Sequence, residues 1–226
     1  RSSTPKVLHN IAGRSLLGHV IEAAATLEPE HLVVVVGHGR EQVIEHIAEI
    51  APWALIVVQA EQLGTGHAVR VALEDLDGRG AVFSDAPIVV LTGDTPLLSG
   101  STLVQLIVAH DQAKAAATVL TTRLGDPYGY GRVIRDAAGG VQRIVEQKDA
   151  TSDELAVDEI NSGMYAFDLS KLRGLLGRLT SDNAQGEQYL PDVIGLLRSD
   201  SAAVAASMCL DPSEIMGVND RVQLAA

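Results

Sequence analysis

Cysteine is almost absent from this chain, and the one that is present, Cys209, has no partner for an intramolecular disulfide. It also lacks the Cys and His neighbours of a structural zinc site, which points to a reducing compartment. Apolar runs such as 32–36 and 88–91 are far shorter than the roughly 20 residues that a membrane-spanning helix needs. We therefore expect a soluble, cytoplasmic protein with no membrane partner.

Positive charge is scarce as well, since 17 Lys and Arg residues stand against 29 Asp and Glu residues, for a formal net charge of -12. Such a surface repels a phosphodiester backbone over most of its area, so we exclude a nucleic-acid-coating role. What the chain does contain is 46% apolar residues over a length of 226, enough to bury a substantial core and to exclude disorder.

Several catalytic signatures are missing too. Neither a Gly-x-Ser-x-Gly elbow nor a suitably placed Cys supports a covalent nucleophile. The 7 histidines form no His-x-x-x-His pair within one predicted helix, which argues against a histidine metal site. We interpret them as surface or turn residues, and His67, which lies in a glycine-containing loop, is the one to follow further.

Short β-branched runs alternate with helical patterns in the first half of the chain. Residues 32–36, 55–58 and 88–91 are apolar throughout, as in strands that helices cover on both faces. Apolar residues at helical spacing over 16–27 and 43–50 predict crossover helices. The pattern predicts one α/β domain built on a mostly parallel sheet with helices on both faces.

The second half changes character, because a turn-rich stretch separates two short β-branched runs. The elements predicted there are a hairpin with strands at 132–135 and 141–145, a strand at 160–167, and helices at about 169–179 and 188–198. No linker or charge block divides the chain. We therefore predict a single domain, 1–226, with a boundary near residue 123 and a small β-containing accessory lobe in the second half.

A polar loop with two glycines, residues 59–67, lies between a predicted strand and a predicted helix. Ligand crevices in open α/β sheets lie at the carboxyl ends of strands, where this loop is expected. It lacks the Gly-Lys-Ser/Thr ending of a Walker loop, but side-chain amides such as Gln59 and Gln62 offer a donor and an acceptor side by side, which can match a nucleobase edge. On the residues alone, a tight turn is an equally good interpretation.

Asp94 follows the predicted strand at 88–91 directly. A carboxylate there faces the same crevice and suits Mg²⁺, a hard cation that prefers oxygen ligands and binds polyphosphate. The alternatives are a turn residue ahead of Pro96 or a cap for the helix near Ser101.

The hairpin region supplies a third candidate group. The glycine pair Gly129 and Gly131 would let a ligand approach the backbone, while Glu146 and Asn161 lie at ends of neighbouring predicted strands and could hydrogen-bond sugar hydroxyls. A backbone bend and a solvated carboxylate are the plainer interpretations of each residue taken singly.

Together these motifs resemble the N-terminal uridyltransferase domain of the GlmU family, bifunctional enzymes with N-acetylglucosamine-1-phosphate uridyltransferase and glucosamine-1-phosphate acetyltransferase activities. The resemblance covers essentially the whole chain. The motifs that carry it are residues 5–9, 59–68, 93–97, 129–132, 144–150, 159–163, 183–187 and 217–219.

The resemblance implies a Rossmann-like nucleotidyltransferase fold with a nucleotide-binding half, 1–123, and a sugar-binding half, 124–226. It implies a transferase that joins UTP to N-acetylglucosamine 1-phosphate with Mg²⁺, releasing pyrophosphate and UDP-N-acetylglucosamine for bacterial peptidoglycan and cell-wall synthesis. The implied roles are phosphate contact for Lys6, a uracil pocket of Gln59, Gln62, Gly64 and Thr65, Mg²⁺ ligation by Asp94 and Asn219, and binding of the N-acetylglucosamine and ribose by Gly131, Glu146 and Asn161. Because the attacking phosphate oxygen is already anionic, positioning and charge neutralisation would account for catalysis, with Lys6 and Asp94 at its centre.

The chain departs from the family pattern in several places. The family's first strand and its glycine-rich signature loop should lie just before Arg1, and we expect the natural protein to contain them, because loss of a central strand would expose the edges of its neighbours. A chain without the loop is expected to lose turnover while its sugar pocket survives. Thr92 stands where many relatives have Tyr, and Pro191 where Thr is common, which affects peripheral substrate contacts. Acetyl transfer and homotrimer formation belong to the family's C-terminal left-handed β-helix. We therefore expect neither property for residues 1–226.

Two other functions fit the same residues. One is another sugar-1-phosphate nucleotidyltransferase that uses dTTP, CTP or GTP, since only Gln59 and Gln62 speak to base identity. The other is a non-catalytic regulatory module that binds a sugar nucleotide. Retention of both implied metal ligands, Asp94 and Asn219, favours catalysis over the second alternative.

Overall fold

The computed structural model describes residues 4–37 and 39–218, and its central feature is a six-stranded sheet in the order β10-β6-β9-β7-β8, with β5 also paired to β9. The strands of this sheet are β5 (Ile88–Val90), β6 (Ala117–Arg123), β7 (Arg132–Arg135), β8 (Val141–Val145), β9 (Glu159–Phe167) and β10 (Val204–Met208). Strands β5 and β6 are both antiparallel to β9 and therefore point the same way, and β10 is parallel to β6. The sheet is therefore mixed, and the expectation that it is mostly parallel is wrong, because every ladder that β9 makes is antiparallel.

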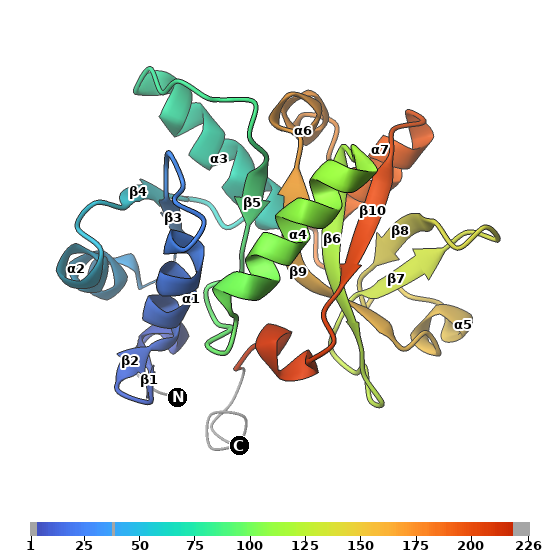
Figure 1. The fold of residues 1–226 in the computed structure, drawn as a ribbon, viewed down its shortest axis with the longest axis horizontal. Coiled ribbons are helices and arrows are strands. Elements are labelled where there is room, and N and C mark those ends of the chain that lie inside the picture. The colour runs from blue at the N-terminus through green and yellow to red at the C-terminus, as the bar shows by residue number, and fades with distance from the viewer. Residues whose placement is uncertain (1–3, 38, 219–226) are drawn as a thin grey trace.

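Helices cover both faces of this sheet, as predicted. The helices are α1 (Leu16–Ala25), α2 (Arg40–Ile50), α3 (Thr65–Gly78), α4 (Gly100–Ala113), α5 (Ser152–Leu155), α6 (Leu169–Leu176) and α7 (Asp192–Ser199), with short 3-10 turns η1 (Lys6–Leu8) and η2 (Pro212–Ile215). Side chains alternate between the two faces of a strand, so Tyr165 and Phe167 of β9 pack with α3, α6 and α7. Met164 and Ala166 pack on the opposite face with α4, which crosses in front of the sheet in Figure 1.

The first strands form a sheet of their own. Strands β3 (Val33–Val36) and β4 (Leu55–Val58) pair in parallel, and α1 and α2 pack against them. We expected these strands and β5 to be buried on both faces, but most of β3 and all of β5 are only half-buried. The reason is that, within the described ranges, β3 is paired to β4 alone and β5 to β9 alone, so each keeps one edge without a ladder partner.

The second half of the chain contributes to the main sheet as well as to a small lobe. Strands β7 and β8 form the predicted hairpin with the predicted bounds, and with α5 they stand to one side of the molecule (Figure 1). Strands β9 and β10, in contrast, lie in the central sheet. The accessory lobe is therefore smaller than the second half, because β9 is inserted between β5 and β6. A short antiparallel pair, β1 (Asn10–Ile11) and β2 (Arg14–Ser15), leads into α1.

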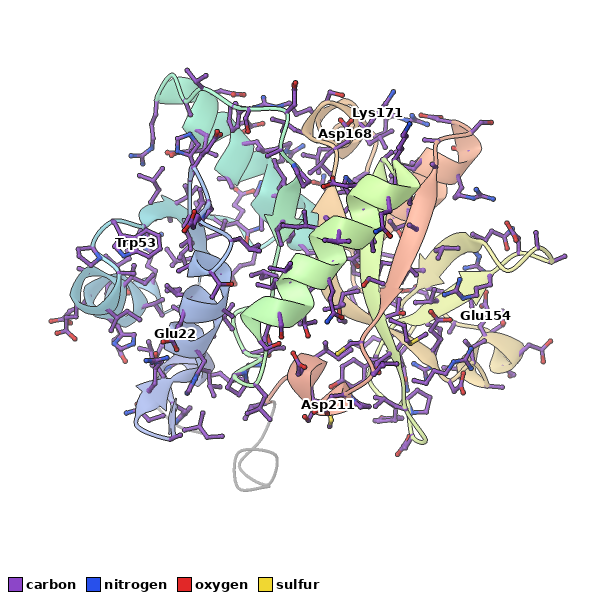
Figure 2. The ribbon with its side chains drawn as sticks, in the orientation of Figure 1. Glu22, Trp53, Glu154, Asp168, Lys171 and Asp211 are labelled. Carbon is purple, nitrogen blue, oxygen red and sulfur yellow. The ribbon has the colours of Figure 1, made fainter. Side chains whose placement is uncertain are left out.

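Two predicted helices begin or end at other residues. Helix α6 starts where the Asp168 carboxylate accepts a hydrogen bond from the Lys171 N–H at 2.9 Å, and Figure 2 labels both residues at the start of this helix. It ends at Leu176, short of residue 179. Helix α7 begins only at Asp192, because the backbone of Gln188 is paired to the loop after β4. Across the described ranges, no helix is both long and apolar enough to span a membrane.

The buried face of α4 gives a stability test. Leu106 is 0% exposed and Val104 on the same helix is 47% exposed. We expect Leu106→Ala to lower the free energy of unfolding by about 2–5 kcal/mol, because a cavity is left in the core, whereas Val104→Ala should change it by less than about 0.5 kcal/mol. Urea unfolding followed by circular dichroism measures both. Equal losses would contradict this orientation of α4.

Candidate functional site

Residues 59–66, which we term the amide loop, comprise the loop after β4 and the first two residues of α3, and they are held by glycine geometry and by backbone pairing. Gly64 has φ 107° and ψ 178°, a region that is essentially restricted to glycine. A Cβ on Gly64 would lie 2.6 Å from the carbonyl oxygen of Gln188. The Gln188 N–H donates to the Leu63 carbonyl at 2.7 Å, and the Gly66 N–H donates to the Gln188 carbonyl at 2.8 Å. The segment before α7 therefore fixes the shape of this loop.

The two glutamines of the amide loop differ in how firmly they are held. Gln59 is 8% exposed, and its Nε2 lies 3.1 Å from the Gly64 carbonyl oxygen and 2.9 Å from His67 Nδ1. Gln62 is exposed, and its amide packs over Gly37, where a Cβ would lie 2.9 Å from Gln62 Nε2. Both amides lie at the carboxyl ends of β3 and β4, as expected, but Gln59 is preorganised by the protein and Gln62 is not.

Thr65 supports the amide loop with its side chain. Its hydroxyl oxygen accepts a hydrogen bond from the Leu190 N–H at 2.9 Å. Gly64 and Thr65 thus have a structural role that follows from the contacts, and the role in a uracil pocket that the resemblance implies stays a prediction.

Lys6 and Asp94 lie together beyond the end of β5. Lys6 Nζ and Asp94 Oδ2 form an ion pair, in which the Lys6 side chain is 43% exposed and the Asp94 side chain 20% exposed. The residue before Asn219, Val218, donates its N–H to the Asp94 carbonyl at 3.0 Å. Gly217 approaches so closely that a Cβ there would lie 3.1 Å from Asp94 Oδ2. We term Lys6 and Asp94 the charge pair.

The contacts of the charge pair decide one alternative for Asp94. Helix α4 is capped by Ser99, whose hydroxyl accepts from the Thr102 N–H at 3.2 Å, so the interpretation of Asp94 as a helix cap is wrong. Asn219, the second implied metal ligand, lies outside the described residues.

The donor set at Asp94 is compatible with Mg²⁺. Throughout 4–37 and 39–218, no group of three His, Cys, Asp or Glu side chains gathers closely enough to hold a metal ion. Mg²⁺ does not require such a cage, because it keeps several water ligands and is commonly bound through one or two carboxylates together with substrate phosphates. A partly exposed carboxylate next to a lysine fits that kind of site.

Gly131, Glu146 and Asn161, which we term the sugar-side group, are brought together by β7, β8 and β9. The Asn161 N–H donates to the Gly131 carbonyl at 2.9 Å. A Cβ on Gly131 would lie 3.0 Å from Glu146 Oε1, so a larger residue there would displace this carboxylate. Among the described residues, no hydrogen bond to the Glu146 carboxylate is formed, so its oxygens remain available as acceptors.

The Asn161 side chain is oriented by groups that donate to it. Its Oδ1 accepts from the Gly163 N–H at 3.0 Å and from the Tyr165 hydroxyl at 2.9 Å. A backbone N–H can only donate, which assigns the oxygen and leaves the amide nitrogen as the free donor. The sugar-side group therefore offers donors from Asn161 and acceptors from Glu146, the pair of functions that sugar hydroxyls require.

Burial changes the acidity of this group. It raises the pKa of Glu146, and the nearby Asp192 and Asp149 carboxylates raise it further. Burial and the Asp149 charge likewise raise the pKa of Asp192, the first residue of α7.

Three residues that the sequence reasoning did not select complete the arrangement. Asp192 lies near Glu146, and Tyr165 orients Asn161. The third residue is Tyr130, whose pKa is raised by burial. The Gly217 N–H opposes this shift, and the Asp94 carboxylate reinforces it. Tyr130, which precedes Gly131 in the chain, therefore lies within electrostatic range of Asp94. In the sequence Tyr165 is indistinguishable from a core residue and Asp192 from an ordinary first-turn acid, so the pattern offered no signal for either.

Comparison with known proteins gives matches over most or all of the chain. Residues 1–153 match the family described as the MobA-like NTP transferase domain. The chain is 55% identical over 225 residues to the Bifunctional protein GlmU of Thermobifida fusca (strain YX), covering 100% of this chain and 46% of that protein. It is 57% identical over 226 residues to the protein of the same name from Streptomyces avermitilis, with the same coverage. The resemblance inferred from the motifs is confirmed, and the chain spans less than half the length of these relatives.

Solved structures support the fold. A nucleoside-diphosphate-sugar pyrophosphorylase from Vibrio cholerae RC9 superimposes with a TM-score of 0.65 at 17% identity, covering 92% of this chain and 85% of that one. A UDP-glucose pyrophosphorylase complexed with UDP-glucose gives a TM-score of 0.68 at 16% identity, covering 89% and 82%. The predicted Rossmann-like nucleotidyltransferase fold is confirmed.

The backbone of Gly64 gives a test of the amide loop. We expect Gly64→Ala to lower the free energy of unfolding by about 1–3 kcal/mol from backbone strain, and by more because the new Cβ meets Gln188. Gly186→Ala is the matched control, since Gly186 has φ +67° but no atom within 4 Å of an added Cβ. Chemical denaturation compares the two variants. A smaller loss at Gly64 than at Gly186 would contradict the described loop geometry.

The raised pKa of Glu146 predicts a pH-dependent stability. Because the folded state disfavours its charged form, Glu146 is destabilising above the pKa it has in the unfolded chain, and this penalty is absent below it. Glu146→Gln should therefore raise the melting temperature at neutral pH, and the gain should shrink as the pH falls towards the ordinary pKa of Glu. Exposed Glu49→Gln is the control. A gain that does not depend on pH would contradict the argument.

Proposed function

Because this chain belongs to the family of MobA-like NTP transferase domains, we propose that it transfers a uridylyl group from UTP to N-acetylglucosamine 1-phosphate, releasing pyrophosphate and UDP-N-acetylglucosamine. In this proposal residues 1–123 bind the nucleotide and residues 124–226 bind the sugar. The product would serve bacterial cell-wall peptidoglycan synthesis in the cytoplasm. Acetyl transfer and homotrimer formation are not proposed for these residues.

The proposal is supported by interactions that relate the sugar-side group to the segment paired with the amide loop and to the charge pair. The segment before α7 pairs with the amide loop through Gln188 and reaches Glu146 through Asp192. The charge of Asp94 contributes to the raised pKa of Tyr130, which is next to Gly131. A nucleobase at the amide loop and a sugar at the sugar-side group would place the reacting phosphates near Lys6 and Asp94.

The chemistry requires little of the protein beyond placement and charge. The attacking atom is a phosphate oxygen that is already anionic, so no general base is needed to activate it. Two polyanions must nevertheless approach each other in a protein of net charge -12. Lys6 supplies a local cation, and holding both substrates in line for attack on the α-phosphate supplies the entropic advantage.

Mg²⁺ would be held by Asp94 together with Asn219, and when bound it would neutralise phosphate charge. The Asp94 carboxylate is paired with Lys6. Substrate phosphates would take over Lys6, which frees Asp94 for the metal.

Asp94 gives the test of this assignment. Asp94→Ala should lower turnover by about 10²–10⁴-fold, because several kcal/mol of charge stabilisation are lost and each 1.36 kcal/mol corresponds to a factor of ten. Asp94→Asn keeps the shape, removes the charge and should lose nearly as much. Exposed Asp85→Asn is the control. Pyrophosphate release from UTP and N-acetylglucosamine 1-phosphate is the measurement, and near-normal release by Asp94→Ala at saturating Mg²⁺ would reject the assignment.

A nucleotide panel separates the proposal from its alternatives. Turnover that is higher with dTTP, CTP or GTP than with UTP would indicate another sugar-1-phosphate nucleotidyltransferase. Binding of UDP-N-acetylglucosamine without turnover of any nucleotide, in the protein that carries this chain, would indicate a regulatory module.

A further inference from the structure

The amide of Gln59 is oriented by an atom that can only accept. Its terminal atom nearest to Gly64 lies 3.1 Å from a backbone carbonyl oxygen. A carbonyl oxygen cannot donate a hydrogen bond, so the Gln59 side-chain atom that faces it has to be the amide nitrogen. The direction of the Gln59 amide therefore follows from the hydrogen-bond network.

His67 takes the second hydrogen of the same nitrogen. Gln59 Nε2 lies 2.9 Å from His67 Nδ1 and has one hydrogen for Gly64 and one for the imidazole. For this arrangement Nδ1 must carry a lone pair, which places the proton of the neutral ring on Nε2. Both donors of the Gln59 amide are then used inside the protein, while no described residue donates to its Oε1.

A glutamine in this state can offer a ligand an acceptor and nothing else. Position 3 of uracil carries an N–H, which donates to such an oxygen. Position 3 of cytosine carries a lone pair, which would face the oxygen without a hydrogen between them, and this leaves two buried acceptors opposed. A free glutamine could rotate its amide and serve either base, so discrimination depends on what prevents the rotation.

We propose that His67 determines base preference by holding the Gln59 amide with its oxygen towards the nucleotide. The inference rests on the proposed function and deepens it. Gly64 alone would leave one Gln59 hydrogen without a partner, so the His67 acceptor supplies the second of the two contacts that hold the amide in this direction. Gln62 cannot take this role, because its side chain is exposed and no hydrogen bond from a described residue fixes its amide.

The test compares UTP and CTP binding, by calorimetry, in the unsubstituted protein and in His67→Phe and His67→Asn. Phe keeps a ring of similar size but offers no acceptor, whereas Asn places its amide oxygen close to the position of Nδ1. We expect the preference for UTP over CTP to fall at least tenfold in His67→Phe and to return largely in His67→Asn. His31→Phe, whose side chain lies by Phe83 and not by the amide loop, should leave the preference unchanged.

Each outcome has a definite meaning. Equal weakening of UTP and CTP binding in His67→Phe would show a merely structural role and overturn the inference, as would an unchanged preference. Equal affinities in the unsubstituted protein would also overturn it. A preserved UTP preference that depends on His67, in a protein without turnover, would overturn the proposed function and leave the inference standing.

A second measurement uses the unsubstituted protein alone. Long-range proton–nitrogen correlation spectra of the histidine rings report which nitrogen of His67 carries the proton. We expect an unprotonated Nδ1 and a protonated Nε2 at neutral pH, before and after UTP is added. A proton on Nδ1 would overturn the inference, because that nitrogen would then need an acceptor where the Gln59 amide nitrogen lies.

Discussion

Strand β9 is hydrogen-bonded to β6 along one edge and, along the other, first to β7 and then to β5. Ile160 pairs with Arg132 of β7, and Tyr165 pairs with Val90 of β5. The register against β6 shifts between these two places, between Asn161 and Tyr165. One strand thereby joins the sheet that positions the charge pair to the hairpin that carries the sugar-side group, so the relative placement of the two depends on this irregularity.

The shift in register is built from side chains and one glycine. The Ser162 hydroxyl donates to the Leu120 carbonyl at 2.7 Å and accepts from the Met164 N–H at 3.1 Å, which satisfies two backbone groups that the broken ladder leaves buried. Gly163 has φ +79°, and a Cβ there would lie 3.0 Å from the Thr92 methyl group. Because the chain turns at Gly163, the Asn161 side chain folds back to the Gly163 N–H. The same irregularity of β9 therefore orients the side chain of Asn161, a candidate sugar-binding residue.

The sequence determined the local elements best where apolar runs end at turn residues. Strand β4 and both strands of the hairpin were predicted to the residue for this reason. Strand β10 (Val204–Met208) was not predicted, because alanine and serine make up most of it and its stability comes from pairing with β6. The start of α7 was misplaced because helical spacing cannot reveal that the Gln188 backbone is already paired elsewhere. In general, an element that depends on a distant partner gives no periodic signal of its own.

In the candidate site, too, some features could be predicted from the sequence, whereas others depend on distant partners. The positions of Gln59, Asp94 and Asn161 at strand ends could be predicted, since residues after strands gather at one edge of the sheet. The direction of each amide could not, because it is set by groups such as Gly64 and Tyr165 that become neighbours only in the folded chain. Asn219 lies outside the described residues, so its place in the metal site stays a prediction.

In the proposed function, the two amides would let a protein of high negative charge recognise neutral groups of a charged ligand. Gln59 is fixed with its oxygen free, and Asn161 with its nitrogen free, in both cases by internal partners that use the opposite end. A ligand then meets a donor or an acceptor that is already oriented, so less rotational entropy is lost on binding. The mismatched ligand meets a group that cannot turn to suit it. Selectivity of this kind lies in residues that need not touch the ligand, and substitutions behind the pocket should change it as strongly as those within.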